Sequence, residues 1–150
     1  MDLILWRHAD AQDGTPDMDR PLTAKGRGQA KKMAAWLNQQ LPEGVRVLVS
    51  PSRRTLQTAD ALERKYDVVQ DLAPGADAAH LLHAAGWPDA KGTVLVVGHQ
   101  PTLGELASLL LFGEAVGMSI KKSGIVWLTN RVRGEMPQTL LKAAMTPDLL

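Results

Sequence analysis

A chain of 150 residues is long enough for one folded domain, and we expect residues 1–150 to form a single domain. Its 45% hydrophobic and 22% charged residues are typical of a globular protein, and its net charge of +1 gives no overall field to attract nucleic acid or an acidic membrane. The absence of cysteine excludes disulfides, thiolate metal sites and a cysteine nucleophile, and it agrees with a reducing cytoplasm.

The N-terminal segment predicts a strand followed by a helix. Residues 3–6 form a continuous apolar run, as expected for a strand that is covered on both faces. Because the run is short and ends at a charged pair, we expect neither a signal peptide nor a membrane span, and we expect the protein in the cytoplasm. Thr23 is positioned to cap a helix that extends to about Leu41. Gly26 and Gly28 weaken this helix, which close packing, a ligand or simple tolerance would explain.

The alternation of strand and helix continues along the chain. Residues 45–49 predict a second buried strand, and Ser50-Pro51 predicts the start of a helix that extends to about Arg64, with serine as the cap. The later elements are a strand at 68–69, a helix over 77–85, a strand over 93–97, a helix opened by Pro101, and closing strands over 125–128 and 140–144. This order predicts an α/β protein, a three-layer α/β/α sandwich with a mostly parallel central sheet.

Polar clusters follow three of the predicted strands. Arg7-His8 follows the first strand, Arg54 lies shortly after the second, and His99 follows the strand over 93–97. Ligands of such sheets bind beyond the carboxyl ends of the strands, so neighbouring strands would bring these residues into one cationic pocket. Arginine matches phosphate oxygens with a planar fork of donors, and a neutral imidazole is a competent nucleophile near pH 7. Arg7, Arg54 and a protonated His99 would stabilise a transferring phosphoryl group without a metal ion.

The same segments resemble the histidine phosphatase superfamily. The similar motifs are Arg7-His8, Arg20-Pro21-Leu22-Thr23-Ala24-Lys25-Gly26, Ser50-Pro51-Ser52-Arg53-Arg54-Thr55-Leu56-Gln57-Thr58-Ala59 and Gly98-His99. The short length is similar to the SixA-type branch, the phosphohistidine phosphatases. The resemblance implies a phosphoglycerate mutase-like fold and catalysis without a cofactor. It also implies that His8 is the catalytic nucleophile and that Arg7, Arg54 and His99 are catalytic residues that bind the phosphoryl group.

The chain departs from the superfamily pattern at several positions. Ala9 stands where glycine usually follows the nucleophile, and Gln100 stands where acid phosphatase members carry an aspartate as leaving-group acid. The stretch between residues 58 and 94 contains no counterpart of the glutamate that mutase members use. The proton donor is therefore unassigned from sequence. The spacing to Gln57-Thr58 selects Arg54 for the site and leaves Arg53 in solvent.

These features favour one function and leave two alternatives. The leading hypothesis is hydrolysis of phosphohistidine on a partner protein, because a phosphorylated imidazole is a reactive donor that needs little help from an acid. A phosphatase of a small phosphoester would need an acid such as Asp10, Asp77 or Glu105. The third possibility is a non-catalytic phosphate-binding module, against which the intact set of arginines and histidines argues.

Two groups of side chains have the composition of metal sites. Asp77, His80 and His83 recur at positions i, i+3 and i+6 of a predicted helix, but three ligands from one short helix give poor tetrahedral geometry. A solvated helix face is therefore the preferred interpretation. A cluster of aspartates lacks the glycine and the terminal glutamate of a calcium-binding loop, and it predicts a polar loop at the rim of the pocket. These aspartates are Asp10, Asp13, Asp17 and Asp19. We expect no metal site.

Overall fold

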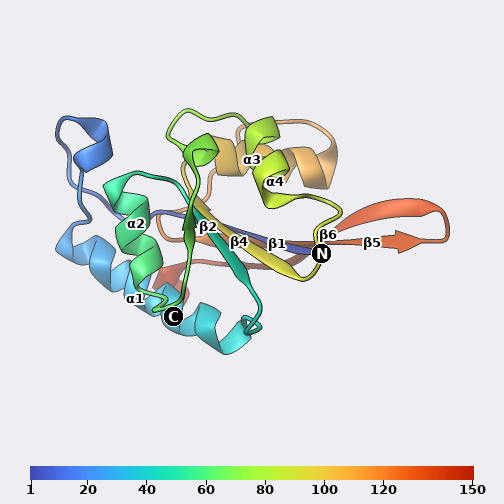
Figure 1. Ribbon diagram of the computed structural model, residues 1–150, viewed down its shortest axis with the longest axis horizontal. Coiled ribbons are helices and arrows are strands. Elements are labelled where there is room, and N and C mark those ends of the chain that lie inside the picture. The colour runs from blue at the N-terminus through green and yellow to red at the C-terminus, as the bar shows by residue number, and fades with distance from the viewer.

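A six-stranded sheet runs through the middle of the molecule (Figure 1). The structure is a computed structural model that describes all 150 residues. The strands are β1 (Asp2–Arg7), β2 (Arg46–Val49), β3 (Asp67–Val68), β4 (Thr93–Gly98), β5 (Ile125–Arg133) and β6 (Met136–Met145). They lie in the order β3-β2-β4-β1-β5-β6. The first four are parallel, β5 is antiparallel to β1, and β6 is antiparallel to β5.

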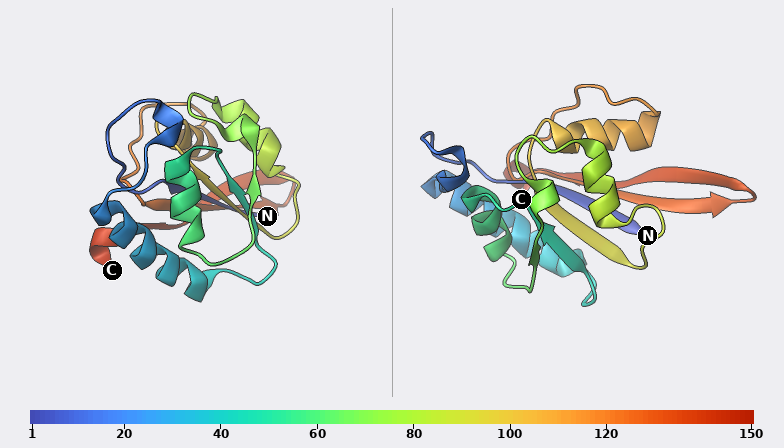
Figure 2. Two further views of the ribbon diagram at one scale, coloured as in Figure 1. Left: turned by 60° about the vertical axis from the view of Figure 1, so that its left-hand side comes forward. Right: turned by 45° about the horizontal axis from the view of Figure 1, so that its top comes forward.

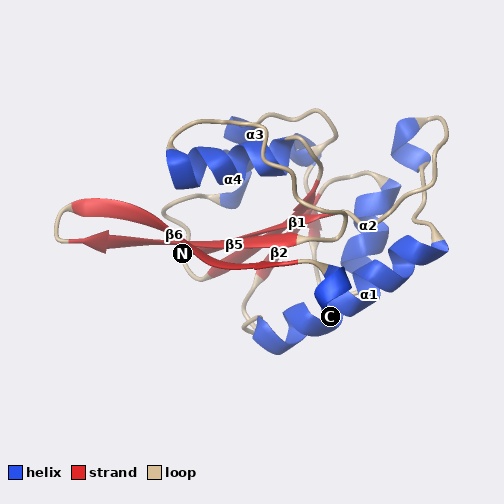
Figure 3. Ribbon diagram, turned by 180° about the vertical axis from the view of Figure 1, so that it is seen from behind, coloured by secondary structure: helices blue, strands red, loops and turns tan.

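Helices cover both faces of this sheet (Figures 1 and 3). α1 (Ala24–Gln40) and α2 (Arg53–Asp60) cover one face, and α3 (Ala78–Ala85) and α4 (Thr102–Phe112) cover the other. Three short 3-10 helices, η1 (Asp17–Asp19), η2 (Gln70–Leu72) and η3 (Pro147–Leu149), complete the chain. The predicted three-layer α/β/α sandwich with a mostly parallel sheet is confirmed. None of the helices combines the length and the apolar character that crossing a bilayer requires.

The core forms two layers because side chains alternate along the central strands. In β1, Leu3 and Leu5 join the apolar cluster under α3 and α4, whereas Ile4 and Trp6 join the cluster under α1 and α2. A strand that is buried on both faces needs apolar residues at every position, which explains the continuous run in the sequence. Burying each of these side chains contributes roughly 1.5–3 kcal/mol. The sheet therefore gives a rigid base for the loops at its ends.

The start of α1 is fixed by close packing against the loop after β1. Thr23 caps the helix as predicted, because its hydroxyl oxygen accepts a hydrogen bond from the Gly26 amide at 2.9 Å. A Cβ on Gly26 would collide with the backbone carbonyl oxygen of Asp10, so close packing explains this glycine. A Cβ on Gly28 would meet nothing within 4 Å, so Gly28 is not a packing requirement.

The start of α2 differs from the sequence prediction. The helix begins at Arg53, and its cap is Ser52, whose hydroxyl oxygen accepts from the Thr55 amide at 3.3 Å. Ser50 remains in the sheet region instead, since its amide donates to the Val97 carbonyl oxygen at 3.1 Å. The prediction that Ser50-Pro51 opens the helix was therefore wrong by two residues. The helix also ends at Asp60, earlier than the predicted end.

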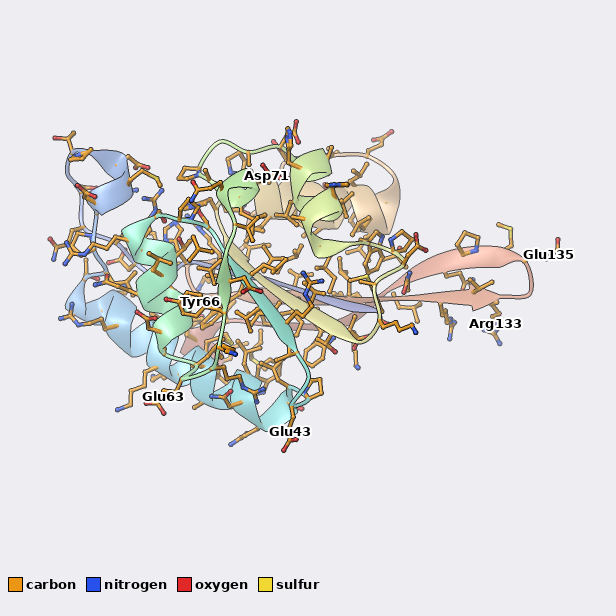
Figure 4. The ribbon with its side chains drawn as sticks, in the orientation of Figure 1. Glu43, Glu63, Tyr66, Asp71, Arg133 and Glu135 are labelled. Atoms are coloured by element: carbon orange, nitrogen blue, oxygen red, sulfur yellow. The ribbon has the colours of Figure 1, made fainter.

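The closing strands are longer than predicted and form a hairpin that extends beyond the sheet. Figure 4 shows Arg133 and Glu135 at its tip, far from the helices. The turn consists of Gly134 and Glu135, and Gly134 has a φ of 64°, which glycine adopts without strain. The outer part of the hairpin is exposed, so its residues lack the apolar pattern that marks the buried part.

Candidate active site

A cavity of about 270 Å³ opens beyond the carboxyl ends of the parallel strands. We call it the strand-end cavity, and its lining includes Arg7, His8, Arg54 and His99. β4 lies between β1 and β2, so the loops that follow these three strands are neighbours. The His8 amide donates to the Gly98 carbonyl oxygen at 3.0 Å, which ties two of these loops together. The structure thus brings together all four residues that we singled out from sequence.

His8 is held in one tautomer. Its Nδ1 donates to the carbonyl oxygen of Ala9 at 2.7 Å, which leaves the Nε2 lone pair available. The residue is only 9% exposed, and burial lowers the pKa of His8 to about 4, although the hydrogen bond to Ala9 opposes this shift. The positive charges of Arg54 and Arg7 lower the pKa further. The ring is therefore neutral at physiological pH, as a nucleophile must be.

His99 lies beside His8, with the ring centroids 5.3 Å apart. Its Nε2 is 2.7 Å from the Ser50 hydroxyl oxygen, and its Nδ1 accepts from Arg54 Nη2 at 3.4 Å. Burial lowers the pKa of His99 to about 3, and repulsion from a protonated His8 ring and from Arg54 acts in the same direction. His99 is thus neutral in this structure, whereas we had expected a protonated ring. The difference arises because the two rings and the guanidinium share one buried space.

The two arginines each present an unused donor. Arg54 is 4% exposed, and its Nη1 and Nη2 bind the backbone and carboxylate oxygens of Asp17 at 2.9 and 3.1 Å. Arg7 Nη1 donates to the Ile120 carbonyl oxygen at 2.7 Å. The Nε atoms of both arginines are buried and have no hydrogen-bond partner. Unpaired buried donors are rare because each costs about 1–3 kcal/mol. Both arginine side chains line the strand-end cavity, where their positive charge would attract an oxyanion.

The order of residues along α2 explains how this helix joins two parts of the site. Arg54 is buried, whereas the neighbouring Arg53 is exposed on the helix surface, as the motif spacing predicted. One turn later, the Thr58 hydroxyl accepts from the Ala9 amide at 3.1 Å and so holds the loop after His8. Helix α2 therefore supplies both a cation for the cavity and an anchor for the proposed nucleophile's loop.

Sequence reasoning assigned no role in the site to three further polar residues, although it placed Asp17 in a polar loop at the rim of the pocket. Arg20 and Lys122 line the strand-end cavity, and the Asp17 carboxylate bridges Arg54 and Arg20, each at 3.1 Å. Although partial burial acts in the opposite direction, hydrogen bonds and charge from these arginines lower the pKa of Asp17. Arg20 begins the Arg20–Gly26 motif noted in the sequence, so a role for it in the site could have been predicted. Asp17 lies in the aspartate-rich loop, and nothing in the spacing separates it from its neighbours.

The side chain of Gln100 has a structural role beside the cavity. Its amide oxygen accepts from the Gly104 amide at 2.8 Å, and its amide nitrogen donates to the Met118 carbonyl oxygen at 3.0 Å. Gln100 thus connects the start of α4 to the loop before β5. The one carboxylate residue that lines the strand-end cavity is Asp13, which is exposed.

The residues considered as metal ligands have other partners. Asp77 caps α3 by accepting from the His80 amide at 2.9 Å, and its carboxylate also contacts the His80 ring at 2.7 Å. Both side chains are largely exposed, in agreement with a solvated helix face. No group of three or more histidine, cysteine, aspartate or glutamate side chains lies close enough to hold a metal ion.

Because two histidines are buried in their neutral form, we expect the free energy of unfolding to fall as the pH is lowered from 7 to 5. Both folded-state pKa values, about 4 for His8 and about 3 for His99, lie below the ordinary value of 6.5. The unfolded chain therefore binds more protons in this range, so the stabilisation is complete above pH 6.5 and is lost as the pH falls toward the folded-state values. We expect the urea midpoint to fall between pH 7 and 5 in the wild type and to fall less in His99→Asn. Identical pH slopes in the two proteins would contradict this assignment.

The chain matches known proteins along most of its length. The model of the histidine phosphatase superfamily (branch 1) matches residues 3–79. Phosphohistidine phosphatase SixA of Escherichia coli K12 is 35% identical over 129 residues, which is 79% of each chain. An uncharacterised protein of Picosynechococcus is 40% identical over 141 residues, covering 85% of this chain and 84% of the relative. A solved structure of the protein histidine phosphatase SixA with tungstate covers 99% of both chains, with a TM-score of 0.79 and 31% identity.

Proposed function

Because the chain belongs to the histidine phosphatase superfamily and is a phosphatase of the SixA branch, we propose that it hydrolyses phosphohistidine on a partner protein. We also propose that the reaction passes through a phosphoryl intermediate on His8. The observation that carries this proposal is the arrangement in the strand-end cavity. A neutral, tautomer-fixed His8 lies beside His99, and the side chains of Arg7 and Arg54 line the same cavity.

In the proposed first step, His8 Nε2 attacks the phosphorus atom of the substrate. The P–Nε2 bond forms as the bond from phosphorus to the substrate imidazole breaks, and the released imidazole nitrogen takes up a proton from solvent water. In the second step, water attacks the phosphorus of phospho-His8, the P–Nε2 bond breaks, and inorganic phosphate leaves. The Nδ1 hydrogen bond to Ala9 keeps the ring in the same orientation through both steps.

The arginines would stabilise the charge on the transferring group. Arg7 ends β1 and Arg54 lies in the first turn of α2, and their guanidinium groups would bind the equatorial oxygens of the phosphoryl group. A phosphoryl group would also place negative charge beside His99, which raises the pKa of a histidine and favours the protonated ring. The tungstate in the similar SixA structure supports an oxyanion site in this fold, because tungstate is a tetrahedral oxyanion.

The surroundings of the strand-end cavity support phosphohistidine as the substrate. An alkyl phosphate needs a proton on its leaving oxygen, and a positioned acid contributes on the order of 10²–10⁴ in rate. Gln100, at the position of the acid in acid phosphatases, has an amide group and already uses both of its polar atoms. Asp13 is exposed and is not held in place by a hydrogen bond or an ion pair. Phosphohistidine releases a better leaving group, so it is less dependent on such an acid.

We expect a phosphohistidine peptide to be hydrolysed about 10²–10⁴ times more efficiently than an alkyl phosphate, the factor that a general acid would otherwise supply. The measurement is kcat/KM for both substrates on one preparation. Asp13→Asn serves as a control and should leave the rate on the phosphohistidine peptide unchanged. A preference for the alkyl phosphate, lost in Asp13→Asn, would instead assign the enzyme to small phosphoesters with Asp13 as the acid.

A further inference from the structure

A second and larger cavity, of about 600 Å³, adjoins the strand-end cavity. We call it the basic basin. Its charged lining residues are Arg7, Lys25, Lys32, Lys121, Lys122 and Asp148. Arg7 and Lys122 line both cavities, so the basin continues directly from the proposed phosphoryl site. The C-terminal segment with η3 lies against α1 (Figure 2), and both segments contribute residues to the lining of the basin.

The basin concentrates positive charge on a protein whose net charge is only +1. Five basic side chains and a single carboxylate line it. Lys121 pairs with Asp148 at 3.4 Å, and Lys122 pairs with Asp10 at 2.7 Å. Lys25 and Lys32 are exposed and have no carboxylate within 4.0 Å. Two lysines of the basin are therefore free to bind an anion from outside the chain.

The sequence of α1 builds one wall of the basin. Lys25, Gly28, Gln29 and Lys32 occupy positions i, i+3, i+4 and i+7, so they share one face of the helix. Gly28 has no neighbour that a Cβ would touch, and its lack of a side chain leaves this wall open between the lysines. At 1.5 Å per residue, the two lysines stand about 10 Å apart along the helix axis. This spacing suits several separate negative charges better than one compact anion.

We propose that the basic basin binds carboxylate side chains that flank the phosphohistidine of the protein substrate, and so selects acidic phosphoproteins. This inference rests on the proposed function. A substrate whose phosphoryl group lies at His8 extends past Arg7 and Lys122 into the basin, because those residues border both cavities. Apart from Pro147 and the stems of the basic residues, no apolar side chain lines the basin, so charged head groups are its main recognition elements. Spread lysines on long stems instead match the acidic surface of a protein.

The test uses three synthetic phosphohistidine peptides that differ only in their flanking residues: glutamate, glutamine or lysine. At low ionic strength, we expect the glutamate peptide to exceed the glutamine peptide about tenfold in kcat/KM, through KM, with the lysine peptide lowest. The preference should shrink at about 0.5 M salt, because exposed charges are screened. Lys25→Glu/Lys32→Glu should abolish or reverse it. Lys31→Glu/Lys65→Glu changes the net charge equally at exposed positions outside the basin, and it should keep the preference.

A small donor separates this inference from the proposed function. All variants should hydrolyse phosphoramidate with the kcat of the wild type, since neither lysine pair touches the strand-end cavity. Normal phosphoramidate turnover with no preference among the peptides overturns the basin inference alone. An equal loss in both double variants also overturns it. A preference for a sugar bisphosphate over its monophosphate, lost only in Lys25→Glu/Lys32→Glu, would assign the basin to a second phosphate of a small substrate. Failure to hydrolyse any of the phosphohistidine donors would refute both proposals.

Discussion

The variant His8→Ala is expected to lose at least about 10⁴-fold in kcat, because a covalent mechanism has no substitute for its nucleophile. The fold should survive, since the ring lies beyond the end of β1 and makes one side-chain hydrogen bond, to the Ala9 carbonyl oxygen. Steady-state rates on a phosphohistidine peptide measure the loss, and circular dichroism and the melting temperature check the fold.

A trapping experiment distinguishes the two histidines. Rapid quenching with a ³²P-labelled donor should label the wild type in an acid-labile form, and peptide mapping should locate the label at His8. The substitution His8→Ala should remove this label completely. His99→Ala lacks the neighbouring ring but keeps His8, so some label should still form at residue 8. Near wild-type turnover by the His8 variant, or a label at His99, would refute the assigned nucleophile.

The second large effect is expected from Arg54→Ala, which should lower kcat/KM by on the order of 10²–10³, the usual result of removing one preorganised donor. Arg54 is 4% exposed, lines the strand-end cavity and has a buried Nε without a partner. Its neighbour Arg53 gives a matched control, because it has the same side chain in the same helical turn and points to solvent. Arg53→Ala should stay within about twofold of the wild type, since an exposed surface change alters little.

The pair of arginine variants also tests the register of α2. Equal losses in both, or a larger loss in Arg53→Ala, would mean that the exposed residue reaches the substrate. Melting temperatures separate a catalytic loss from an unfolded protein. We expect Arg54→Ala to remain folded, because it removes a buried cation together with its ion pair to Asp17, whose carboxylate is then free to face solvent.

The layered fold could be predicted from sequence because the central strands are buried on both faces. A run such as Leu3 to Trp6 has no polar position, and this pattern indicates a parallel sheet between two layers of helices. The strands of the β5–β6 hairpin were predicted too short because their outer part is not buried and so lacks an apolar pattern. Beyond Leu128 its residues face solvent, and the remaining signal was the glycine of its turn, Gly134.

The positions of the four proposed site residues could also be predicted, because each ends a strand, directly follows one, or lies in the first turn of the helix after one. The partners of these residues could not. Ser50 was expected to cap a helix, yet its hydroxyl group contacts His99, because the cap falls two residues later at Ser52. The ion pair between Asp17 and Arg54 joins residues that are far apart in sequence, and only the folded chain brings them together. The protonation of His99 likewise depends on burial, which a list of residue types does not contain.

The contact between Asp17 and Arg54 has a consequence for product release in the proposed reaction. The Asp17 carboxylate is 56% exposed, so it is free to turn outward when a phosphoryl group arrives, and it stays close to the guanidinium. When inorganic phosphate departs, this carboxylate again provides Arg54 with a partner, and no bare cation is left in the protein interior. Phosphate that binds Arg54 must displace the Asp17 carboxylate, so the net affinity of the site for free phosphate is weaker than for an unpaired arginine. In the proposed reaction, the Asp17 side chain would thereby limit inhibition of the enzyme by its product, inorganic phosphate.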